Sequence, residues 1–129
     1  MGREVHFDDD GVILKLNGVT GLFALKLKLK IPYNKIKSVH VDNFNAPQWM
    51  LRMPGTSISA LNIYEGSFKY AGEWYFLSYE NRVPLVIIEL EGHKKYKYVI
   101  FETDAPSSVA SDIRKHIRSF INNVITPAK

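Results

Sequence analysis

Apolar and polar residues alternate over several short stretches of the chain, and this two-residue period predicts β-strands with one buried face. In the clearest stretch, 22–31, leucines and Ile31 alternate with lysines. Further strands, separated by turn residues, are predicted at 12–16, 36–42, 61–64, 66–70, 73–79, 85–90 and 96–102. About seven short antiparallel strands at roughly ten-residue spacing are typical of a barrel or a sandwich.

The period changes near the end of the chain. Apolar residues recur there at spacings of three and four, which predicts an amphipathic helix over 104–124 with a buried stripe; the stripe consists of Val109, Ile113, Ile117, Phe120, Ile121 and Val124. Asp104 suits the N-cap and Pro106 suits the first turn. The stripe must be buried on the sheet or in the open mouth of a barrel. We therefore expect a mainly β fold with one C-terminal α-helix.

The composition is that of one folded domain. The chain has 129 residues, of which 46% are hydrophobic and 23% charged, and this excludes a disordered chain. No apolar run approaches the ~20 residues of a membrane span, and the start of the chain has no apolar signal core. With no cysteine, disulfides, thiolate nucleophiles and Cys-based zinc sites are excluded. We expect a single cytoplasmic domain over 1–129 that begins with an acidic lead-in, 1–10.

The formal net charge of +4 is spread unevenly. Segment 22–41 contains no acid and carries a basic stripe, which consists of Lys26, Lys28, Lys30, Lys35 and Lys37. Such a stripe can attract an anionic membrane surface, or it can be a solvated sheet face that guards an edge against pairing.

The sequence contains few candidate catalytic or metal-binding motifs. Asp8, Asp9 and Asp10 could hold a hard cation, but no further acid follows at a ligand spacing, and a solvated acidic turn is the favoured interpretation. The four histidines lack metal-ligand spacing, and no nucleophile elbow, phosphate loop or dinucleotide motif is present. We expect a protein that is not an enzyme and that needs neither a metal nor a cofactor.

Aromatic residues suggest a contact surface. Both faces of the 73–79 strand are apolar, whereas a solvated antiparallel strand should be polar on its outer face. Segment 43–59 mixes prolines with large apolar residues, and the sequence leaves open whether it is exposed or packed on the body. Trp and Met are frequent at interfaces. The residues we expect in protein contact are Trp49, Met50, Met53, Trp74, Tyr75 and Tyr79.

Several stretches resemble the uncharacterised bacterial pleckstrin-homology-like (PH-like) domains. They are 52–56 (Arg-Met-Pro-Gly-Thr), 64–68 (Tyr-Glu-Gly-Ser-Phe), 72–76 (Gly-Glu-Trp-Tyr-Phe), 84–89 (Pro-Leu-Val-Ile-Ile-Glu) and 96–106. The resemblance implies a partly open antiparallel barrel of about seven strands, capped by the helix. Members that bind inositol lipids carry basic residues in the first hairpin loop, but 17–21 contains none. The resemblance therefore implies a fold and no function.

Three functions remain open. The first is a non-enzymatic module for protein–protein contact, including self-association into an oligomer. The second is peripheral binding to an anionic membrane through the basic stripe. The third, a small-ligand carrier, is disfavoured because large core residues should fill a small barrel. Nucleic acid is an unlikely partner because the chain has few arginines and no recognisable binding motif.

Overall fold

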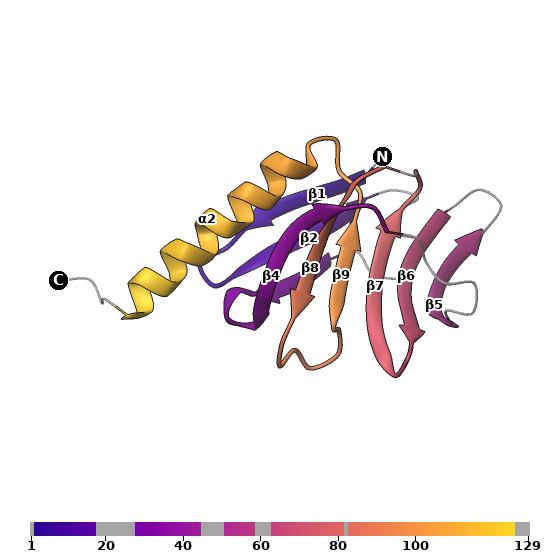
Figure 1. Cartoon of the computed structure of the whole chain (residues 1–129), viewed down its shortest axis with the longest axis horizontal. Helices are drawn as coiled ribbons and strands as arrows, with labels where there is room; N and C mark the ends of the chain where they lie inside the picture. Colours follow the sequence, from indigo (N-terminus) through magenta and orange to yellow (C-terminus); the bar gives the residue numbers. More distant parts are fainter. Residues whose placement is uncertain (1, 18–27, 45–50, 59–62, 82, 126–129) are drawn as a thin grey trace.

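The computed structural model describes residues 2–17, 28–44, 51–58, 63–81 and 83–125, and shows a β-rich body with one long helix at its side (Figure 1). The elements are β1 (Gly2–Phe7), β2 (Gly11–Asn17), β3 (Lys28–Pro32), the 3-10 helix η1 (Tyr33–Lys35), β4 (Ile36–Asp42), β5 (Leu51–Ile58), β6 (Ile63–Tyr70), β7 (Glu73–Tyr79), β8 (Leu85–Leu90), β9 (Tyr98–Phe101) and α2 (Pro106–Ile125). The prediction of a mainly β fold with a C-terminal helix is confirmed.

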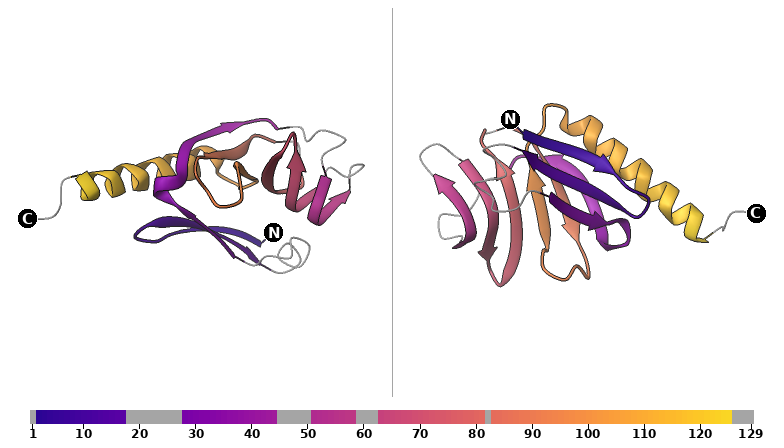
Figure 2. Two further views of the ribbon diagram at one scale, coloured as in Figure 1. Left: turned by 90° about the horizontal axis from the view of Figure 1, so that it is seen from below. Right: turned by 180° about the vertical axis from the view of Figure 1, so that it is seen from behind.

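The strands form two separate sheets rather than a closed barrel among the residues described. The smaller sheet has the order β1-β2-β3, and the larger has the order β4-β8-β9-β7-β6-β5. Figure 2 shows the smaller sheet facing the larger one as a second layer.

One pairing differs from the predicted antiparallel order. β9 lies between β7 and β8, antiparallel to β8 but parallel to β7. β8, which follows β7 in the chain, does not pair with it but leaves room for one strand between them. β9, the next strand in the chain, occupies that place. The prediction of a purely antiparallel arrangement is therefore wrong at β7 and β9. The other pairs are antiparallel, including the predicted hairpin of β6 and β7.

The segment expected as an acidic lead-in forms a strand and a turn. In β1, Val5 and Phe7 are partly buried against the core, whereas Glu4 and His6 are exposed. The Asp8 N–H donates to the Gly11 carbonyl at 2.8 Å and closes the turn into β2. The sequence analysis missed β1 because the charges of this segment obscured its short two-residue period.

The larger sheet carries apolar side chains on both faces, as the pattern of 73–79 predicts. Trp74 and Phe76 belong to the core between the two sheets, and Leu77 and Tyr79 belong to a second cluster on the opposite face. Tyr75 packs against that second cluster. The alternation of side chains along β7 therefore serves two cores.

Helix α2 packs through the first part of its apolar stripe. Ala110 and Ile113 are completely buried in the core between the sheets. The Val109 N–H donates to the Ala105 carbonyl at 3.0 Å, so Ala105, rather than Asp104, occupies the cap position. The C-terminal turns of α2 project beyond the strands (Figure 1), and Ile121 remains 45% exposed there.

Candidate functional site

Of the residues predicted for protein contact, the structure describes the side chains of Trp74, Tyr75 and Tyr79. Trp49 and Met50 lie outside the described residues, and Met53 lies in β5 at one edge of the larger sheet. Tyr79 is completely buried in the folded chain. Trp74 and Tyr75 are partly exposed but pack against different cores on opposite faces of the sheet.

The two partly exposed aromatic residues already have close neighbours. The ammonium groups of Lys69 and Lys95 lie 5.5 and 5.0 Å from the centre of the Trp74 ring, within the range of cation–π attraction. The Tyr75 ring stacks on the ring of Tyr98, with 5.0 Å between centroids. Both residues therefore contribute to intramolecular packing.

Ion pairs interrupt the predicted basic stripe. Lys26 lies outside the described residues. Lys30 lies 2.7 Å from a carboxylate oxygen of Asp10 and 3.3 Å from one of Asp8. The hydrogen bond from Lys30, followed by its charge, lowers the pKa of Asp10. Lys37 lies 3.6 Å from Glu89.

Of the remaining lysines of the stripe, Lys28 is exposed. Lys35 lines a pocket of about 420 Å³. The other lining residues are Lys30, Pro32, Gly92, His93 and Lys94. Three of the residues that line the pocket are lysines. Its charge is offset by the two aspartates bound to Lys30 and by Glu91 in the neighbouring turn.

A second depression is a groove between β4 and the C-terminal half of α2. Its volume is about 450 Å³, and it is lined by Ile36, Lys37, Ser38, Val39, Arg114, Ile117, Arg118 and Ile121. Among the described strands β4 pairs with β8 alone, and Arg114 of α2 contacts it at Val39.

Arg114 forms that contact. Its Nε and Nη2 donate hydrogen bonds of 3.1 and 2.8 Å to the Val39 carbonyl oxygen. This carbonyl oxygen, on an edge strand of the larger sheet, therefore accepts two hydrogen bonds from α2. The two bonds hold the guanidinium at the wall of the groove.

The rim of the groove has a surplus of positive charge. Lys37 and Lys97 both lie 3.6 Å from the same oxygen of Glu89, so one carboxylate serves two ammonium groups. Arg118 is exposed, and within the described part of the chain it forms no ion pair. The groove therefore has an apolar floor, which includes Ile121, and a basic rim.

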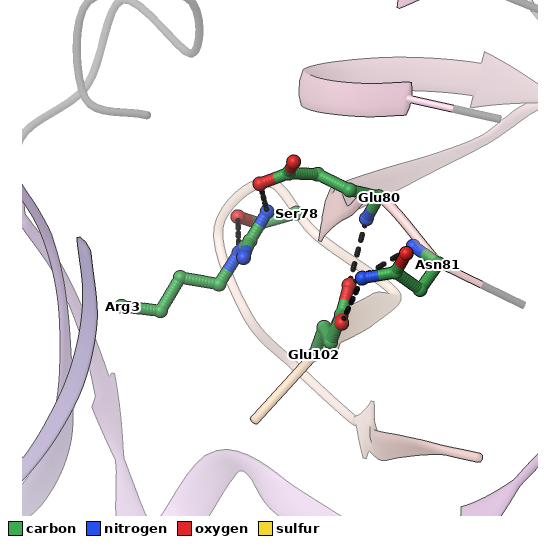
Figure 3. A network of polar contacts seen from close by, with 5 residues as sticks. All are labelled: Arg3, Ser78, Glu80, Asn81 and Glu102. Atoms are coloured by element: carbon green, nitrogen blue, oxygen red, sulfur yellow. Dashed lines mark hydrogen bonds and ion pairs between the residues drawn. The ribbon is translucent and has the colours of Figure 1, made fainter. Parts of the chain in front are cut away.

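A third depression, of about 220 Å³, is polar and joins the two sheets (Figure 3). Arg3 of β1, whose side chain is only 5% exposed, donates to Ser78 Oγ at 2.6 Å and lies 3.4 Å from Glu80. Glu102 accepts hydrogen bonds from the backbone N–H groups of Glu80 and Asn81 at 2.8 and 3.1 Å, and from Asn81 Nδ2 at 2.7 Å.

This network changes the ionisation of Glu102. Burial alone would raise the pKa of Glu102. The hydrogen bonds from Asn81 and from the Glu80 backbone, together with the charge of Arg3, outweigh burial and lower that pKa. Arg3 links the smaller sheet to Ser78 of the larger one and to Glu80, which follows β7, and Glu102 holds the turn after β7 to the end of β9. Together these contacts form a structural clamp. Sequence reasoning missed it because its members are far apart in the chain.

Comparisons with protein-family models, with characterised proteins and with solved structures gave no match. Within the described ranges, no group of three or more metal-ligating side chains comes together. No helix in the same residues is long and apolar enough to cross a membrane.

Proposed function

We propose that this chain is a non-enzymatic, PH-like binding module that contacts protein partners through the groove between β4 and α2. The observation that carries the proposal is the exposure of Ile121 beside an apolar groove on an edge strand. An exposed large apolar side chain that continues an apolar groove favours a contact surface over a solvated face.

The PH-like assignment is supported by the β-rich body and by the C-terminal helix packed against it. The two separate sheets and the parallel pairing of β7 with β9 depart from the open barrel that this assignment implies. The proposal of protein contact therefore depends on the groove and not on the family.

A pair of matched variants tests the proposal. Ile121→Ser removes the exposed apolar side chain of the groove, and Val83→Ser removes one of similar exposure, 39%, at a distant turn. Proteins of the source cells that are cross-linked to the wild-type chain should be lost with Ile121→Ser and retained with Val83→Ser. Sedimentation over micromolar concentrations tests self-association with the same variants. Equal capture and equal association by all three chains would refute the groove as the contact surface.

Binding to an anionic membrane is the second candidate. It is favoured by the pocket that contains Lys35 and Lys94, since neither lysine is ion-paired within the described residues. Cosedimentation with phosphatidylglycerol vesicles at low salt, weakened by Lys35→Gln with Lys94→Gln, would support it. The absence of cosedimentation at low salt would refute it.

The small-ligand carrier has less support. Large buried side chains such as Phe76 and Phe101 occupy the core between the sheets. A retained small ligand in native mass spectrometry would support the carrier function.

A further inference from the structure

We infer that the groove between β4 and α2 binds an acidic segment of a partner protein, one that inserts an apolar side chain flanked by carboxylates. This inference rests on the proposed function and adds the chemistry of the partner. It depends on three features of the groove, namely its apolar floor, the fixed guanidinium of Arg114 and the surplus of positive charge at the rim.

The floor of the groove suits an apolar side chain. Ile36, Val39, Ile117 and Ile121 supply its apolar lining. Its volume of about 450 Å³ lies within the range of ~300–1,000 Å³ for ligand sites. Ile121 is 45% exposed, and an inserted side chain would cover it.

Arg114 supplies a cation that is already positioned. A guanidinium has five N–H donors, and two of them are used on the Val39 carbonyl. The other three remain in a fixed orientation beside the groove. A carboxylate that approaches Arg114 therefore gains charge-assisted hydrogen bonds without the loss of side-chain freedom that a mobile arginine would suffer.

The rim selects the sign of the partner's charge. Arg114, Arg118 and Lys37 line the groove, and the carboxylate of Glu89 is shared between Lys37 and Lys97. A basic segment would be repelled by this surplus, whereas an acidic one would be attracted and oriented. A second copy of this chain could offer its Asp8–Asp10 turn, but Asp8 and Asp10 are already bound to Lys30. A separate acidic partner segment is therefore the better fit.

A phage-displayed library of random short peptides provides the probe. The library is selected on the wild-type chain and depleted on Ile121→Ser, so that only peptides that need the groove remain. The enriched peptides should combine Asp or Glu with Leu, Ile, Phe or Met. Their affinities are then measured by fluorescence anisotropy, and their position is mapped by NMR shifts of the amides of 36–39 and 114–121.

Charge variants test the role of the rim. Arg118→Glu should weaken binding by about 10-fold and Arg118→Gln by about 3-fold, while Lys115→Gln, an exposed residue of the same helix outside the groove lining, should change it by less than about 2-fold. Raising the salt from about 50 to about 300 mM should weaken the wild-type complex several-fold.

The possible results separate the two proposals. Peptides that need Ile121 but lack acids, or that bind Arg118→Glu as tightly as wild type, would overturn the acidic partner and leave protein contact at the groove intact. Failure to enrich any peptide over the Ile121→Ser background, with no partner captured from cells, would overturn both. Self-association lost with Arg118→Glu and with Asp9→Asn would overturn the separate partner in favour of a second copy.

Discussion

Replacing Glu102 by glutamine should destabilise the fold by removing charge from the clamp between the sheets. Three N–H groups donate to the carboxylate, at 2.7, 2.8 and 3.1 Å. In Glu102→Gln the side chain keeps its shape, and the Asn81 amide can rotate to accept from the new NH2 group. The loss is therefore mainly the difference between charge-assisted and neutral hydrogen bonds.

The size of the loss follows from the number and the exposure of these bonds. A hydrogen bond to a charged group contributes about 1.5–3 kcal/mol, and a neutral one about 0.5–1.5 kcal/mol. The site is only partly buried, so solvent screens part of that difference at each bond. We expect Glu102→Gln to lower the free energy of unfolding by about 1–2 kcal/mol at pH 7, measured by urea unfolding with tryptophan fluorescence.

The pH dependence makes this prediction specific. The pKa of Glu102 is lower in the folded chain than its ordinary value of 4.5, so the stabilisation is present above that ordinary value and is lost as the pH falls through the folded pKa. The gap between wild type and Glu102→Gln should therefore narrow as the pH falls below that ordinary value. Glu91→Gln, an exposed control, should change the free energy of unfolding by less than about 0.5 kcal/mol. A gap that persists unchanged at low pH, or no gap at pH 7, would refute the reasoning.

Three further substitutions test the packing, each measured by urea unfolding. Tyr96→Phe leaves the buried Ser67 hydroxyl without its 2.6 Å partner and should cost about 1–2 kcal/mol, and adding Ser67→Ala should recover part of it; full additivity would contradict the pairing. Ile113→Ala removes a fully buried side chain and should lower the free energy of unfolding by about 2–5 kcal/mol, so a loss below about 1 kcal/mol would mean that α2 is loosely packed. Gly11→Ala would place a Cβ 2.8 Å from the Ile31 carbonyl oxygen and should cost about 1–3 kcal/mol; a neutral result would show that β2 and β3 can separate freely there.

Local patterns were sufficient to predict most of the elements. The alternation of 36–42 and the apolar run of 85–90 predicted β4 and β8 with the bounds found in the structure. The turn at Ala71 and Gly72 gave the β6–β7 hairpin, and both residues have positive φ there. These features depend on neighbours in the chain, which a sequence pattern records directly.

Long-range pairing could not be predicted in the same way. The position of β9 between β7 and β8 is decided by contacts between distant segments, and the apolar pattern of β9 suits either an antiparallel or a parallel neighbour. The stripe of α2 was predicted to be buried along its length, but Ile121 is 45% exposed. The groove was missed for the same reason, since Arg114 and Val39 meet only in the folded chain.

The central position of β9 also has a consequence for biogenesis. While the polypeptide is being synthesised, β4–β8 and β5–β6–β7 can exist only as two disconnected ladders, because the strand that links them is translated after all the others. Until then each ladder has an edge strand with unpaired backbone N–H and C=O groups that can pair with neighbouring nascent chains. Helix α2, translated next, covers the side of β4, so the completion of the sheet and the sealing of its flank follow one another within a short length of chain.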